Sequence, residues 1–177
     1  KNGENGDTAA GSYHRWREDV ALLKEMGLGA YRFSAAWPRI APSGDTSWNP
    51  KGFDYYDRLV DGLLEAGIQP WATLYHWDLP QALQSRGGWQ NAETVRTYAA
   101  YAEKMARHFK GRVTHWFTFN EPQCFIGLGY GGGGHAPGLL LDGQSLETCW
   151  DNFRLAHALA VDALHRVDGA NLVGLAS

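Results

Sequence analysis

Helix-like and strand-like patterns alternate along this chain, and that order constrains its fold more than any other feature. Apolar side chains recur at helical spacing in four stretches, residues 14–26, 55–66, 92–109 and 146–167. A short apolar or aromatic run follows each stretch, so strands are expected at residues 30–38, 69–77, 113–120 and 172–176. Alternating elements of this kind predict an α/β fold, in which helices cover a parallel sheet.

Two parallel architectures compete, a doubly wound open sheet and a (β/α)8 TIM barrel. Polar and aromatic residues gather at the C-terminal ends of three successive predicted strands, which is where barrels place their active sites. A dinucleotide-binding sheet would instead show a G-x-G-x-x-G turn, and none follows the first strand. A complete barrel takes about 250 residues, whereas this chain has 177. We therefore expect residues 1–177 to form one segment of a barrel domain, a partial TIM barrel.

Charge and hydropathy exclude several classes of partner. The formal net charge is −3 and no basic stripe is visible, so nucleic acid and anionic membrane surfaces are not expected partners. No apolar run approaches the roughly 18 residues that a membrane helix needs. The first residues are polar and glycine-rich, without the pattern of a signal peptide, which favours a cytoplasmic protein.

Neither a metal nor a cofactor is expected. The seven histidines show no H-E-x-x-H or H-x-H grouping, and the two cysteines lack the spacing of metal ligands. The glycine run 131–134 is not followed by Lys and Ser or Thr, as a phosphate-binding loop would be. We interpret this run as part of a long, flexible loop beside a site.

The run Thr118-Phe119-Asn120-Glu121-Pro122 places an amide and a carboxyl at the end of the third strand. A carboxyl beside a hydrogen-bonding amide and aromatic rings is suited to protonating a glycosidic oxygen. The alternative is that Glu121 only caps or solvates the strand end. Similar residues at two other strand ends favour the functional interpretation.

The first two strands supply those residues. Strand alternation puts Arg32 and Ser34 on one face and Phe33 on the other. An inward-facing Arg implies a carboxylate nearby, either at a site or in a structural ion pair lower in the barrel. Trp37 could be a platform for a sugar or a lid on the core. At the end of the second strand, His76 lies beside Trp77, at a level where its imidazole could donate to a sugar hydroxyl.

These residues make the chain resemble glycoside hydrolase family 1, the β-glucosidase family. Five motifs occur in the family's order and spacing over nearly the whole chain. They are Tyr13-His14-Arg15-Trp16 with Glu18-Asp19, Tyr31-Arg32-Phe33-Ser34 with Trp37-Pro38-Arg39-Ile40, Tyr75-His76-Trp77-Asp78-Leu79-Pro80, Thr118-Phe119-Asn120-Glu121-Pro122, and Gly129-Tyr130 through His135-Ala136-Pro137-Gly138.

The resemblance implies a retaining β-glycosidase that hydrolyses terminal β-linked sugars, with a β-glucoside or related small glycoside as substrate. Glu121 would be the general acid/base and Asn120 would bind the sugar 2-hydroxyl. His76 would bind another hydroxyl, and Trp77 would line the pocket for the terminal sugar. Arg32 would lie against the nucleophilic carboxylate.

The family's nucleophile motif, Thr-Glu-Asn-Gly, is absent from this chain. The resemblance covers only the second to fifth barrel strands, so we expect two unpaired sheet edges and a complementary C-terminal half, on this or another chain. Two other hypotheses remain. One is a non-catalytic half-barrel that binds sugar or only assembles; the other is an endo-acting glycanase of a related barrel family, which the motifs around His76 and His135 disfavour.

Overall fold

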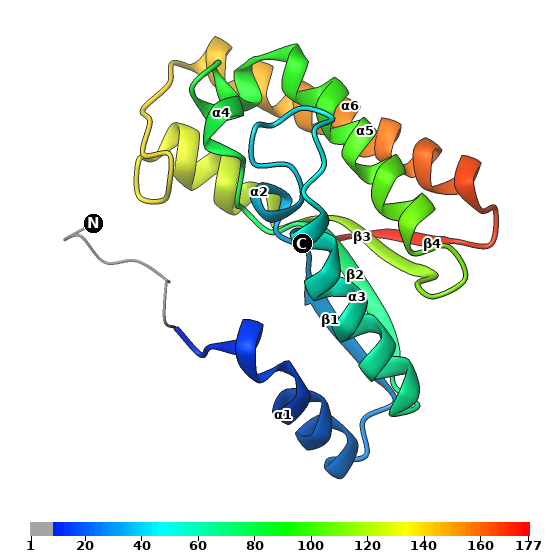
Figure 1. Cartoon of the computed structure of the whole chain (residues 1–177). Helices are drawn as coiled ribbons and strands as arrows, with labels where there is room; N and C mark the ends of the chain where they lie inside the picture. Colours follow the sequence, from blue (N-terminus) through cyan, green and yellow to red (C-terminus); the bar gives the residue numbers. More distant parts are fainter. Residues whose placement is uncertain (1–8) are drawn as a thin grey trace.

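A computed structural model describes residues 9–177, in which helices and strands alternate as expected (Figure 1). The strands are β1 (Ala30–Ser34), β2 (Gln69–Tyr75), β3 (His115–Asn120) and β4 (Leu172–Ala176). The longer helices are α1 (Ser12–Glu25), α3 (Pro50–Glu65), α5 (Ala92–His108) and α6 (Gly143–Val167). Shorter ones are α2 (Trp37–Ile40), α4 (Gln81–Gln84), the 3-10 helix η1 (Gly88–Gln90) and the π-helix η2 (Gln123–Gly131). The first residues, in which we expected no signal peptide, lie partly outside this range.

The four strands form one parallel sheet in the order β1-β2-β3-β4. Each strand therefore pairs with the next one along the chain, without the reversal of order that marks a doubly wound sheet. Helices α5 and α6 lie side by side over one end of the sheet, and α1 and α3 lie together at the other end (Figure 1). The parallel α/β fold is thus confirmed.

Several element boundaries differ from the expected ones, for local reasons. We expected the second long helix to begin near Tyr55, after a loop, but α3 begins at Pro50. The Asn49 side chain accepts a hydrogen bond from the backbone N–H of Lys51 at 3.2 Å, and Pro50 suits the first helical turn. Asn followed by Pro is also common in loops, but here the pair caps and begins a helix. Asp142 caps α6 in the same way, by accepting from the backbone N–H of Ser145.

The expected long loop after Glu121 is also partly wrong. Residues Gln123–Gly131 form the π-helix η2, which buries Phe125, Ile126 and Tyr130. Glycines alternate with apolar residues in this stretch, which is a pattern typical of loops. The sequence therefore does not reveal the buried face of the helix. Only the segment after Gly131 lacks a helix or strand until α6 begins.

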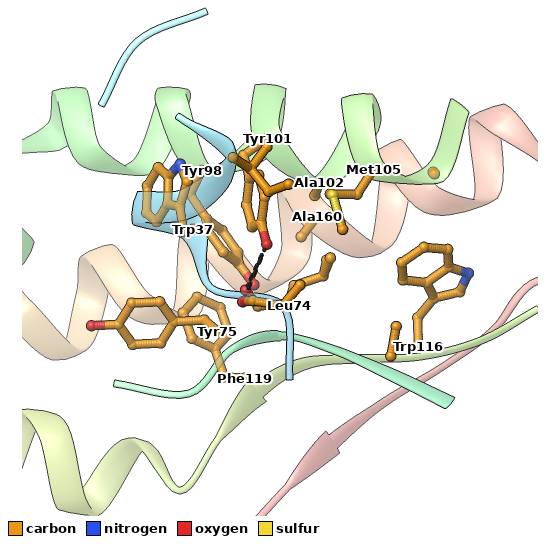
Figure 2. Close-up of a cluster of buried hydrophobic side chains, with 14 of the residues drawn as sticks. Trp37, Leu74, Tyr75, Tyr98, Tyr101, Ala102, Met105, Trp116, Phe119 and Ala160 are labelled. Atoms are coloured by element: carbon orange, nitrogen blue, oxygen red, sulfur yellow. Dashed lines mark hydrogen bonds between the residues drawn. The ribbon is translucent and has the colours of Figure 1, made fainter. Parts of the chain in front are cut away.

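Aromatic rings between the sheet and helices α5 and α6 make up much of the core (Figure 2). Trp37 is fully buried and stacks on Tyr101 of α5, with ring centroids 5.3 Å apart. Of the two roles considered for Trp37, the structure shows the core role. The Tyr101 hydroxyl donates to the Leu74 carbonyl at 3.1 Å, the bond drawn in Figure 2.

A register shift interrupts the pairing of β3 with β4. Phe117 pairs with Gly174, but Asn120 pairs with Ala176, so β3 has one more residue than β4 between these points. Phe117 is half-buried beneath the guanidinium of Arg32, whereas Phe119 is fully buried in the aromatic core. The bulge therefore brings Phe119 into the core, although simple alternation would place it on the same face as Phe117.

The two outer strands, β1 and β4, are sheet edges within the described residues, as expected. Leu172 at the start of β4 is 62% exposed, and Leu175 on the same strand is also exposed. An apolar hollow of about 240 Å³ lies over the sheet between Trp71, Phe117 and Val173. No helix within residues 9–177 is both long and apolar enough to span a membrane.

Candidate active site

The residues singled out from the sequence meet at the carboxyl ends of β1, β2 and β3. Arg32 lies on β1, His76 and Trp77 directly follow β2, and Asn120 and Glu121 stand at the end of β3. Because the carboxyl ends of neighbouring parallel strands share one edge of the sheet, these side chains can reach one another.

Asn120 is the centre of the hydrogen-bond network that joins them. Its side-chain oxygen accepts from the Arg32 guanidinium, and its amide nitrogen lies 3.0 Å from Glu121 Oε2 and 3.2 Å from His76 Nε2. Arg32 can only donate, so it determines which side-chain atom of Asn120 is the oxygen. The two amide hydrogens of Asn120 then serve Glu121 and His76.

The same logic sets the tautomer of His76. Since the Asn120 amide donates to Nε2, the imidazole proton lies on Nδ1, which is 2.8 Å from Ser34 Oγ. Burial, followed by the positive charge of Arg32, lowers the pKa of His76, and Glu121 opposes this shift. His76 is therefore held neutral near pH 7, with Nδ1 bonded to Ser34. Strand alternation predicted that Ser34 shares a face with Arg32, but it did not predict this contact.

Arg32 is held by neutral partners. Its Nε donates to Thr73 Oγ1 at 2.8 Å, and its guanidinium lies 4.6 Å from the centre of the Phe117 ring. Arg32 and Ser34 are exposed while Phe33 between them is buried, so the predicted alternation is confirmed. We expected a carboxylate beside Arg32. Among residues 9–177, however, no Asp or Glu side chain forms an ion pair with Arg32.

Trp77 lies half-buried between the site and the segment that follows η2. Its ring centroid is 5.6 Å from that of His135, which directly follows the glycine run 131–134. The residue that follows the glycine run is therefore in contact with Trp77. Trp77 also lines a cavity of about 190 Å³ together with Asp78, Phe125 and Tyr130.

Asp78 directly follows Trp77 and is a further titratable group, to which the sequence motif alone assigned no role. Burial raises the pKa of Asp78 to about 7, against the lowering effect of backbone N–H groups and Arg39. Within residues 9–177, no group of three His, Cys, Asp or Glu side chains is placed to hold a metal ion.

Two helices hold the strand segment that leads to Glu121. The Tyr98 hydroxyl of α5 donates to the Thr118 carbonyl, and Thr118 Oγ1 lies 2.7 Å from Nδ1 of His157 on α6. Nothing in the local sequence identifies these partners, because they lie 20 and 39 residues away along the chain. The site as a whole offers a carboxyl for proton transfer, surrounded by groups that bind hydroxyls.

Comparisons with known proteins identify the family of the chain. The sequence model of Glycosyl hydrolase family 1 matches residues 1–177. Beta-glucosidase A of Thermotoga maritima is 43% identical over 175 residues, and 1,4-beta-D-glucan glucohydrolase of Thermotoga neapolitana is 47% identical. These alignments cover 99% of this chain but only 39% and 41% of the relatives, so the chain spans about two-fifths of their length.

Solved structures give the same result. The T. maritima family 1 β-glucosidase superposes with a TM-score of 0.95 at 43% identity, over 99% of this chain and 40% of that one. The psychrophilic β-glucosidase BglU of Micrococcus antarcticus gives 0.93 at 51% identity, over 98% and 36%. The sheet is therefore part of a TIM barrel, as predicted. With a family match over its whole length, the chain belongs to glycosyl hydrolase family 1.

Proposed function

We propose that residues 1–177 are one segment of the catalytic barrel of a retaining β-glycosidase, and that this segment carries the acid/base. The observation that supports this most directly is the position of Asn120. Its side chain is hydrogen-bonded to Glu121, His76 and Arg32 at once, so an acid and three polar groups face the same point. The names of the relatives support a terminal β-glucoside as substrate.

In the proposed reaction, a carboxylate from outside this chain attacks the anomeric carbon while the glycosidic C–O bond breaks. Glu121 gives its proton to the departing oxygen. Water then attacks the glycosyl–enzyme ester, Glu121 accepts a proton from it, and the sugar leaves with the nucleophile restored. Retaining enzymes hold the two carboxyl groups about 5 Å apart. Arg32, with no carboxylate partner in residues 9–177, is placed to lie against the incoming nucleophile.

The remaining roles follow from the polar groups that face Glu121. Asn120 binds the sugar 2-hydroxyl, His76 binds a second hydroxyl, and Trp77 lines the pocket. The T. maritima β-glucosidase has been crystallised with castanospermine, deoxynojirimycin and glucoimidazole. Those complexes support a compact polyhydroxylated ligand for the present site. A cytoplasmic location, as expected from the sequence, stays a prediction.

A non-catalytic half-barrel is the second candidate function. The open edges β1 and β4, and the lack of a carboxylate beside Arg32 in the described residues, are the observations that favour it. Such a segment would bind sugar or only assemble with a complementary half. The two candidates differ in whether turnover appears once the barrel is completed.

The test is to complete the barrel. Residues 1–177 are co-expressed with the C-terminal remainder of the T. neapolitana relative, and we call the complex the reconstituted enzyme. We expect release of nitrophenol from an aryl β-glucoside by the complex and none by either part alone. The control is the same C-terminal remainder paired with its own N-terminal portion. A folded complex that stays inactive, beside an active control, would support the non-catalytic half-barrel.

Ser34→Ala should weaken sugar binding by the reconstituted enzyme. Removing the hydroxyl leaves the Nδ1 proton of His76 without its partner, so the imidazole loses its fixed tautomer and orientation. A lost neutral hydrogen bond corresponds to about a 3- to 10-fold weaker inhibition constant for deoxynojirimycin. Ser34→Thr, which keeps a hydroxyl, is the matched control. An unchanged inhibition constant in Ser34→Ala would show that the contact does not orient His76.

A further inference from the structure

Trp77 and Glu121 share an uncommon backbone conformation. Their φ angles are 79° and 46°, in the left-handed region that side-chain-bearing residues seldom adopt. Within residues 9–177, Ala9 is the other non-glycine residue in this region. Strained backbone of this kind persists only where surrounding contacts hold it, and it is common at active sites.

A hydrogen bond links Trp77 to the peptide group that joins Asn120 to Glu121. The indole N–H of Trp77 donates to the carbonyl oxygen of Asn120 at 3.0 Å. This carbonyl belongs to the peptide group between Asn120 and Glu121. The N–H of the same peptide group donates to the Ala176 carbonyl on β4 at 2.7 Å. One peptide group is thus held at its oxygen from the end of β2 and at its nitrogen from the end of β4.

Holding this peptide group determines where the Glu121 side chain points. The angle φ of Glu121 describes rotation about the bond from its nitrogen to Cα. When the peptide plane is held on both sides, this bond is held as a rotation axis, and the observed φ of 46° then defines the direction of the Cα–Cβ bond. Within the part of the chain that the structure describes, the carboxyl has one side-chain hydrogen bond, from the Asn120 amide at 3.0 Å. Without the indole donor, the backbone is free to relax towards negative φ, which redirects the carboxyl.

We propose that Trp77 is a positioning residue for Glu121, acting through its indole N–H on the Asn120–Glu121 peptide group. This role is additional to that of its ring at the sugar, and it rests on the proposed function of Glu121 as acid/base. The ring and the N–H have separable tasks. The ring contacts His135 and lines the neighbouring cavity, while the N–H serves the peptide group alone.

The experiment removes the N–H and keeps the ring. In the reconstituted enzyme, Trp77 is replaced by 3-benzothienylalanine, in which sulfur stands for the N–H. We measure kcat/KM on phenyl and 2,4-dinitrophenyl β-glucosides, because phenol departs slowly without a proton and dinitrophenol does not need one. We expect about a 3- to 10-fold loss on the phenyl glucoside, the effect of one neutral hydrogen bond, and almost none on the dinitrophenyl glucoside.

Trp71 supplies the matched control. It stands on β2, the strand that leads to Trp77, and its indole N–H donates to the exposed Gln69 side chain at 3.1 Å. The same replacement at Trp71 should leave kcat/KM unchanged on both substrates. Equal losses of kcat/KM on both glucosides after replacing Trp77 would indicate a role in binding. No loss on either glucoside would show that the N–H is dispensable. Each of these two results overturns the proposal.

Amide exchange tests the contact without any catalysis. In the 177-residue chain, the Glu121 amide should exchange with solvent about 3- to 10-fold faster after the Trp77 replacement, because its hydrogen bond to Ala176 loses a fixed partner plane. An unchanged exchange rate overturns the proposal. If the unsubstituted reconstituted enzyme hydrolyses neither glucoside, the proposed function is overturned instead. The catalytic effect of this contact is then overturned with it.

Discussion

Glu121→Gln should lower kcat/KM of the reconstituted enzyme about 10²- to 10⁴-fold on phenyl β-glucoside, the range of general acid catalysis. Gln keeps the size and polarity of the side chain but has no proton to transfer at useful acidity. The loss should shrink as the leaving group becomes more acidic and nearly vanish for dinitrophenol. Kinetics on a series of aryl β-glucosides gives this dependence directly.

The second half of the reaction supplies an independent check of this prediction. Without a general base, water attacks the glycosyl–enzyme slowly, whereas azide needs no deprotonation. Azide should therefore raise turnover of dinitrophenyl β-glucoside by the Glu121→Gln variant and yield the β-glycosyl azide. Glu147→Gln is the control, because Glu147 is exposed on α6 and its ion-pair partner among residues 9–177 is Arg154. A uniform loss across leaving groups, without rescue by azide, would assign Glu121 to sugar binding instead.

The general position of the site could be predicted from the sequence because parallel strands impose it. Once Arg32, His76 and Glu121 are assigned to the ends of successive strands, they must lie along one edge of the sheet. Which atoms touch could not be predicted. The tautomer of His76 depends on Ser34, and the backbone of Glu121 depends on Trp77 and Ala176; these contacts arise from register and from φ angles that no residue pattern encodes.

The predicted element boundaries were wrong where a residue type is common in two kinds of local structure. Asn followed by Pro occurs both in loops and at helix starts, and at Asn49 the bond to Lys51 identifies the helix start. The π-helix η2 was missed because its glycines at 127, 129 and 131 suggest flexibility. The starts of the strands were located more reliably, since β1, β2 and β4 begin at the expected residues. The first strand was expected to reach residue 38 but ends at Ser34, and Trp37–Ile40 form the helix α2 instead. β2 ends two residues early, before Trp77 with its left-handed conformation.

The bulge in β3 places neighbouring residues in the aromatic core and in the candidate active site. It turns Phe119 into the aromatic core, while Asn120, the next residue, reaches Arg32 and His76. The Phe119 ring lies within 6.0 Å, between centroids, of rings from five different elements. These partners are Tyr75, Trp89, Tyr98, Phe125 and Phe153.

Phe119→Ala should therefore destabilise the 177-residue chain by about 3–5 kcal/mol, the range for removing a large buried ring and leaving a cavity. The fully buried ring contacts β2, η1, α5, η2 and α6, so these elements cannot all move inward together to fill the space. Urea unfolding followed by tryptophan fluorescence gives the free energy of unfolding, with the slope compared between variants.

Phe117→Ala is the matched control, because it removes the same ring from the same strand on the other side of the bulge. Phe117 is half-buried, and the charged Arg32 lies over its ring. Less apolar area returns to water and no closed cavity forms, so we expect less than half the loss measured for Phe119. Equal losses would mean that the bulge does not separate the two rings. A larger loss at Phe119 would show that the bulge places this ring in the aromatic core, where it anchors the end of β3 that carries Asn120.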